Sequence, residues 1–131
     1  MLFRSLTTKL ADGADAQHPH WYLQALSVAD GSLVPGFPVT IAGTPDNTPG
    51  LPFDAFYEHQ RPGLLLLDGV VYAAFGAHCD VAPYRGYVVG VSTTTHAVTT
   101  MWSDESGTGT DRKSTRLNSS HTDISRMPSS A

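Results

Sequence analysis

The sequence contains a single cysteine, and it lacks the long apolar runs and catalytic signatures of several protein classes. The lone Cys79 allows no internal disulfide and no Cys-x-x-Cys metal or redox site. No stretch of about 18 consecutive residues is apolar enough to predict a membrane-spanning helix. The chain also has no Gly-rich phosphate loop and no Gly-x-Ser-x-Gly elbow. It therefore carries no motif of a nucleotide-binding protein or of an α/β-hydrolase.

Basic residues are also scarce, except at the C-terminus. Residues 111–131 hold four of the eight Lys and Arg and six Ser, with no Gly and no aromatic residue. Such a composition buries too little apolar surface to offset the entropy of ordering, so we predict a disordered tail. In residues 6–110, three basic residues stand against ten acidic ones, a formal net charge of −7. A phosphate backbone requires a basic face, so we exclude nucleic acid as a partner.

The two termini are consistent with one DNA element translated in opposite orientations. Residues 1–5 can be written GTG CTC TTC CGA TCT. The reverse complement of this stretch, shifted by one base, encodes Asp111-Arg-Lys-Ser. Residues 1–5 and 111–131 therefore resemble translated sequencing adapter, a processing scar to be excluded from fold reasoning. We expect residues 6–110 to be the native segment, a piece of a longer protein.

The first half of this segment has the pattern of β-structure, and no window shows helical periodicity. Residues 20–27 predict a strand with Trp21, Leu23 and Ala25 on one face and with Tyr22 and Leu26 on the other. Asp30-Gly31 predicts a turn, and residues 38–42 an edge strand. Residues 43–56 are rich in Pro, Gly, Asp and Thr and predict a long loop.

The second half predicts two hairpins. In the first, residues 64–67 and 70–75 flank Asp68-Gly69, a pair that supplies the positive φ angles of a type I′ turn. In the second, residues 86–92 and 97–102 are joined across residues 93–96. The continuous apolar runs LLLL and VVYAAF predict strands covered on both faces, as in stacked sheets.

An internal repeat supports the prediction of stacked sheets. YLQALSVADGSLV, from Tyr22, aligns without gaps with YVVGVSTTTHAVT, from Tyr87, at a constant offset of 65 residues. Each copy predicts a strand, a tight turn and a return strand, and the copies lie near residues 20–34 and 70–102. The offset exceeds the roughly 40–50 residues of a propeller blade, and we attribute the excess to an insertion at residues 43–60.

Three segments of the second copy carry a family resemblance: Val70-Val71-Tyr72, the stretch from Gly86 to Val91, and Trp102. They fit the pattern VVYxxxxxGxLxALDxxTGxxxW, so the chain resembles β-propellers with pyrroloquinoline-quinone-like (PQQ-like) repeats. The turn at residues 93–96 departs from the pattern, which prefers Asp and Thr-Gly there. The resemblance implies an all-β fold of two incomplete antiparallel blades, neighbouring blades as partners, and a periplasmic or extracellular bacterial protein.

Two functions stay open on this resemblance. The first is a non-catalytic scaffold that contacts protein or carbohydrate. The second is a piece of a quinoprotein dehydrogenase, whose intact propeller would hold PQQ and Ca²⁺ in its central channel. The dehydrogenase requires a Trp platform, vicinal cysteines and a catalytic Asp, but this chain has no Cys-Cys pair. We therefore favour the scaffold. A propeller fold does not by itself imply cofactor binding, so we assign no catalytic or metal-binding residue.

The candidate site residues lie around the first hairpin. His78, Cys79 and Asp80 follow the strand at residues 70–75, in a loop position where function is often found. A Cys-His pair suggests nucleophilic catalysis, but neighbours on an extended chain point to opposite faces. We favour a structural loop, with Asp80 accepting backbone N–H groups and Cys79 packing as a small apolar residue.

Arginine and histidine residues supply the remaining candidates. Arg61 and Arg85 flank the main hairpin and could pair with Asp54 or Asp80, or contact an anionic ligand; we favour the pairing. His18 and His20, with His59 or with Asp12 and Asp15, could bind a divalent metal. Their spacing is not that of a strong site, so we favour a solvated loop for the first two.

Overall fold

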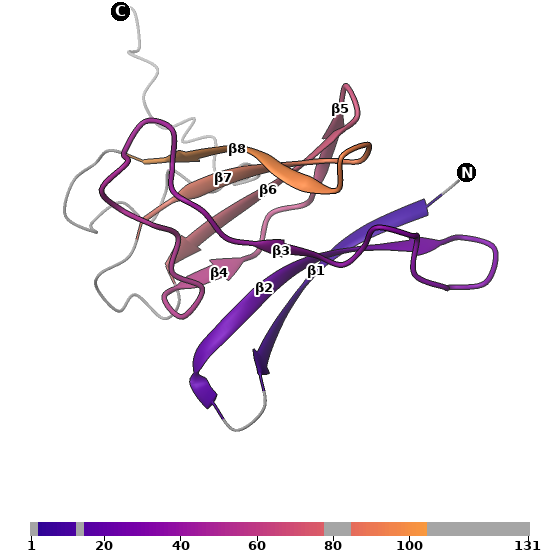
Figure 1. Ribbon diagram of the computed structural model, residues 1–131, viewed down its shortest axis with the longest axis horizontal. Coiled ribbons are helices and arrows are strands. Elements are labelled where there is room, and N and C mark those ends of the chain that lie inside the picture. Colours follow the sequence, from indigo (N-terminus) through magenta and orange to yellow (C-terminus); the bar gives the residue numbers. More distant parts are fainter. Residues whose placement is uncertain (1–2, 13–14, 78–84, 105–131) are drawn as a thin grey trace, which may run out of the picture.

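The chain folds as two antiparallel β-sheets, neither of which closes into a barrel (Figure 1). The computed structural model describes residues 3–12, 15–77 and 85–104, and within them there is no helix. The predicted all-β class is therefore confirmed. In this part of the chain no helix offers the length and apolarity that crossing a membrane requires. The predicted disordered tail at residues 111–131 lies outside the described residues.

The N-terminal sheet has three strands, in the order β1-β2-β3. Their bounds are β1 Phe3–Asp12, β2 Asp15–Ser27 and β3 Val39–Ile41. The predicted alternation in β2 is confirmed, because Trp21, Leu23 and Ala25 are buried while Tyr22 and Leu26 are half-buried. β3 is the predicted edge strand and pairs with β2 opposite Trp21 and Leu23.

β1 includes residues that the coding pattern assigns to an adapter. Phe3 pairs with Ser27, and Ser5 pairs with Ala25. Because a backbone ladder uses only N–H and C=O groups, this pairing does not depend on which side chains these residues carry.

The C-terminal sheet has five strands: four follow the order β4-β6-β7-β8, and β5 pairs with β6 outside that order. The bounds are β4 Glu58–Gln60, β5 Leu65–Leu67, β6 Val70–Ala77, β7 Tyr87–Ser92 and β8 Ala97–Ser103. Both predicted hairpins are confirmed. Asp68 and Gly69 have φ angles of 49° and 76°, as a type I′ turn requires.

The two sheets pack face to face through one apolar core. The indole of Trp21 on β2 meets the ring of Phe75 on β6 edge to face, with ring centroids 5.4 Å apart. The inward side chains at the centre of the interface are at most 5% exposed, which excludes water there; they are Trp21, Leu23 and Ala25 on β2 and Tyr87, Val89 and Val91 on β7. The core residues are Trp21, Leu23, Val39, Ile41, Val71, Ala73, Phe75, Tyr87, Val89, Val91 and Met101.

The segment between β3 and β4 is the predicted long loop, and it is packed rather than loosely solvated. The N–H of Asp46 donates to the carbonyl of Met101 (2.7 Å), and the side-chain amide of Asn47 donates to the carbonyl of Ser103 (2.7 Å). Figure 1 shows this loop running beside the end of β8 before it returns to β4. Phe53 packs edge to face on Phe75, with centroids 5.0 Å apart, so the loop covers one end of the core.

The expectation that both apolar runs are covered on two faces is wrong for LLLL. Leu65, Leu66 and Leu67 are 53%, 58% and 53% exposed. The physical reason is topological: β5 pairs only with β6, off the main order of strands. In β6, by contrast, Val71, Ala73, Ala74 and Phe75 are buried.

The two repeat copies have the same turn geometry at the predicted offset. The N–H of Gly31 donates to the carbonyl of Ser27 (2.9 Å), and that of His96 donates to the carbonyl of Ser92 (3.1 Å). Both Gly31 and His96 have positive φ angles, 74° and 53°. Leu26 bridges to Leu33 just as Val91 pairs with Val98. The internal repeat is therefore a structural repeat, and not only a similarity of letters.

The turn of the second copy rests on the chain that follows the turn of the first. A Cβ added to Gly36 would lie 2.4 Å from the His96 ring, and Gly36 has a φ of +92°. The neighbouring Phe37 ring meets the same imidazole edge to face at 5.3 Å. Only glycine fits here, because both the left-handed backbone and the close ring disfavour any Cβ.

We expect Gly36→Ala to destabilise the fold more than Gly31→Ala. Both residues have positive φ, which costs a side chain about 1–2 kcal/mol, but a Cβ at Gly31 meets nothing within 4 Å. Urea denaturation of both variants measures the difference. The double variant Gly36→Ala/His96→Ala should recover part of the loss; if it is no better than Gly36→Ala alone, the ring is not the obstacle.

Candidate functional site

The structure describes two of the five candidate residues near the first hairpin. His78, Cys79 and Asp80 lie outside the described residues. Arg61 is exposed and directly follows β4, whereas Arg85 is half-buried and lies two residues before β7. The predicted arginine partner Asp54 accepts the N–H of Phe56 (2.9 Å), so its carboxylate caps a local turn.

Arg85 belongs to a polar cluster around Glu58, a residue that sequence reasoning missed. Glu58 begins β4 and is only 2% exposed. Its Oε1 accepts the backbone N–H of Arg85 (3.3 Å), and its carbonyl accepts the indole N–H of Trp21 (3.2 Å). The cluster therefore links β2 of one sheet to β4 of the other and to the chain entering β7.

Tyr87 completes the cluster with a perturbed phenol. Burial raises the pKa of Tyr87 above its ordinary value of 10.0, and the negative charge of Glu58 raises it further. The charge of Arg85 lowers that pKa, and that of Asp54 raises it. The hydroxyl donates to the carbonyl of Pro52 (3.4 Å), in the covering loop. The phenol is thus held neutral as a structural donor, and its raised pKa does not suit a base at neutral pH.

The histidine metal hypothesis finds no support in the described residues. His18 and His20 lie in strand β2, so the expected solvated loop is wrong. The His59 ring packs edge to face near Trp21 and the His20 ring lies tilted near Tyr22, both with centroids 6.2 Å apart. Across residues 3–12, 15–77 and 85–104, no three His, Cys, Asp or Glu side chains come together in a way that could hold a metal ion.

The described residues also do not fit PQQ. The Trp21 indole is 5% exposed and packs in a T-shaped contact with the Phe75 ring, so it offers no open platform for a planar cofactor. Trp102 is half exposed, but the structure groups no metal-binding carboxylates in the described residues. We therefore derive no chemistry through PQQ or Ca²⁺.

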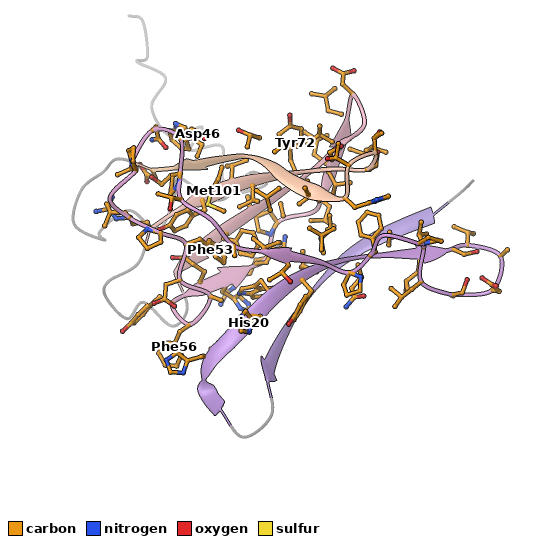
Figure 2. All side chains as sticks on the ribbon, in the orientation of Figure 1. His20, Asp46, Phe53, Phe56, Tyr72 and Met101 are labelled. Atoms are coloured by element: carbon orange, nitrogen blue, oxygen red, sulfur yellow. The ribbon has the colours of Figure 1, made fainter. Side chains whose placement is uncertain are left out.

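The most unusual surface is the apolar side of the C-terminal sheet that faces away from the core. We call it the outer face. Cross-strand partners lie on the same side of a sheet, and the pairs Leu65–Tyr72, Leu67–Val70 and Val88–Trp102 all point outward. Leu65, Leu67 and Trp102 are each at least half exposed. Figure 2 shows Tyr72 on the side of this sheet away from Phe53.

The repeat explains which side of each sheet is buried. Leu23 is fully buried, but its repeat equivalent Val88 is half-buried on the outer face. Conversely, Tyr87 and Val91 are buried, while their equivalents Tyr22 and Leu26 are half-buried. The two sheets therefore stack head to tail: one surface of the first copy packs on the opposite surface of the second.

Sequence reasoning could not have found this arrangement from periodicity alone. β2 and β7 both alternate, and alternation does not say which side meets a neighbour. The buried Glu58 gave no signal either, since a short polar strand reads as a loop. The repeat offset identifies which residues are equivalent, but it does not say which side of the interface each occupies, because the alternation of sides holds only within one strand.

Comparison with known proteins adds no family. No family model, no curated protein and no solved structure matches the chain.

We expect Glu58→Gln to lower the pKa of Tyr87 while leaving it above the ordinary value. The substitution removes the negative charge, but burial, the larger cause, remains. Alkaline titration of the Tyr87 ring carbon by NMR measures the change. An unchanged or higher pKa would contradict the assigned cause.

The raised pKa also predicts alkaline destabilisation. The stability that depends on the neutral Tyr87 phenol is complete below pH about 10, and it is lost as pH rises through the folded-state pKa. Tyr87→Phe should remove this component of the loss in unfolding experiments across that range. Tyr57→Phe is the control, and it should leave the component in place.

Proposed function

We propose that the chain is a non-catalytic repeat module, two successive incomplete blades of a propeller-type protein, that serves as a scaffold for protein or carbohydrate contacts. The head-to-tail stacking of two equivalent hairpins carries this proposal. In a ring of repeats, every blade uses the same two surfaces, one toward the preceding blade and one toward the next. A periplasmic or extracellular setting belongs to the proposal through the family resemblance.

The exposed outer face supports further blades as partners. Within this face, Val88 is the repeat equivalent of Leu23, which is fully buried in the first copy. A contiguous apolar surface of this kind marks an interaction site. The expected partner is the sheet of a further blade. It would present to the outer face the same surface that the C-terminal sheet presents to β2.

The chemistry of the described residues also favours a scaffold over an enzyme. The pKa of Tyr87 is raised by burial, and its hydroxyl donates to the carbonyl of Pro52. The buried carboxylate of Glu58 holds the chain entering β7 through the Arg85 N–H. Each group thus stabilises the packing of the two sheets.

The test is to express the longer protein that contains this segment. We expect Trp102 to be protected from acrylamide quenching there and accessible in the 131-residue chain, because the next blade would cover the outer face. A Trp21→Phe background isolates the Trp102 signal, since the chain has only two Trp. Equal quenching in both proteins would contradict the proposal.

The same longer protein tests the dehydrogenase alternative. We expect no PQQ-dependent dye reduction with alcohols or sugars. If dye reduction requires PQQ and is lost on replacing Asp54 or Asp104 with Asn, the protein is an enzyme and the scaffold proposal is contradicted.

A further inference from the structure

We infer that Asp46 and Asn47 form an edge cap: they occupy the outer hydrogen-bonding edge of β8 and thereby keep a second copy of the chain from adding a strand there. β8 is the last strand in the order β4-β6-β7-β8, so a neighbouring strand lies along only one of its two edges. A row of unpaired N–H and C=O groups on an edge strand is a template for pairing with another chain. The inference rests on the hydrogen bonds of β8 and not on the repeat, so it is independent of the proposed function.

The edge cap takes the place of a neighbouring strand at Met101. The N–H of Asp46 donates to the carbonyl of Met101 (2.7 Å), and the N–H of Met101 donates to Oδ2 of Asp46 (3.3 Å) (Figure 2). One residue thus donates to and accepts from the same partner, as paired residues of an antiparallel ladder do. The hydroxyl of Thr100 donates to the same Oδ2 (3.2 Å), which fixes the carboxylate at the edge.

Asn47 repeats this pattern two residues further along the strand. Its side-chain amide donates to the carbonyl of Ser103 (2.7 Å), and its Oδ1 accepts the N–H of Ser103 (2.9 Å). Residues two apart on a strand present their N–H and C=O groups to the same edge, so Met101 and Ser103 are successive sites for strand pairing. The hydroxyl of Ser103 also donates to that of Thr48 (2.9 Å). A second strand could therefore reach these backbone groups only if the edge cap moved.

The preceding part of β8 is protected by an irregularity. Between the partners of Gly90 and Val91, β8 has one extra residue, Thr99, which makes a β-bulge. A bulge bends and twists the strand, and this is one of the ways in which proteins prevent pairing at a sheet edge. The edge cap covers the regular part that follows, where a strand could otherwise add.

Four variants test the inference. Asp46→Ala/Asn47→Ala removes the edge cap, whereas Asp46→Asn keeps a side-chain oxygen that can accept the N–H of Met101. Asp54→Ala is the matched control, because it removes a carboxylate from the same loop that accepts a backbone N–H within that loop. Asn47→Ala removes only the bonds to Ser103, and it takes the place of the double variant if that variant does not fold.

Amide hydrogen exchange in dilute solution measures the edge cap itself. We expect the amides of Met101 and Ser103 to exchange about tenfold faster in the double variant than in the wild type, because they lose their acceptors. Asp46→Asn and Asp54→Ala should resemble the wild type, and Asn47→Ala should speed exchange at Ser103 alone. The amides of β7, an interior strand, should stay protected and show that each variant is folded.

Sedimentation velocity over a concentration series measures what the edge cap prevents. Two uncapped β8 strands can pair antiparallel across a two-fold axis, so a second copy supplies the matching strand. We expect the double variant to self-associate about tenfold more tightly than the wild type and Asp54→Ala. At the higher concentrations the amides of Met101 and Ser103 should regain protection, because they then donate to the second copy.

Three results would overturn the inference. One is exchange at Met101 and Ser103 that is as fast in the wild type as in the double variant. The second is a folded variant without the edge cap that associates no more tightly than Asp54→Ala. The third is tighter association without renewed protection of these two amides, which would place the contact elsewhere. None of these results bears on Trp102 in the longer protein, so the proposed function is tested separately.

Discussion

The packing of the N-terminal sheet on the C-terminal sheet in one apolar core, to which Leu23 of β2 and Val89 and Val91 of β7 belong, is the interaction on which the rest of the structure depends. It removes the core side chains from water and holds together two sheets that share no backbone ladder. The Glu58 cluster and the loop from Asp46 to Phe53 both lie at the margins of this core. The hydrogen bonds of this cluster and this loop satisfy polar groups that lie close to the apolar core.

The same packing also defines what the molecule leaves exposed. Two equivalent hairpins that stack head to tail use one surface each, and each keeps its other surface free. The exposed Trp102 and Leu33 follow from that geometry. The molecule therefore has the form of one unit in a row of stacked repeats, and we expect its function to depend on the molecules that it contacts.

Most of the strands could be predicted from the sequence because their signals are local. Alternation in β2, the Asp68-Gly69 turn and the second hairpin depend only on neighbouring residues, and the structure confirms all three. Burial depends on which surface meets which sheet, so the exposure of Leu65 to Leu67 was not predictable. The candidate site was predicted poorly for a related reason: the role of Glu58 arises from Trp21 and Arg85, which are distant in sequence.

The central claim is that equivalent residues of the two copies lie in opposite environments, and paired alanine variants test it most directly. Unfolding free energies would be measured in dilute solution for Leu23→Ala, Val88→Ala, Leu26→Ala and Val91→Ala. Truncating a buried residue costs about 2–4 kcal/mol, and truncating a half-exposed one costs less. The account predicts that Leu23→Ala costs more than Val88→Ala, whereas Val91→Ala costs more than Leu26→Ala. The same ranking in both copies, with position 23 above 26 and position 88 above 91, would contradict it.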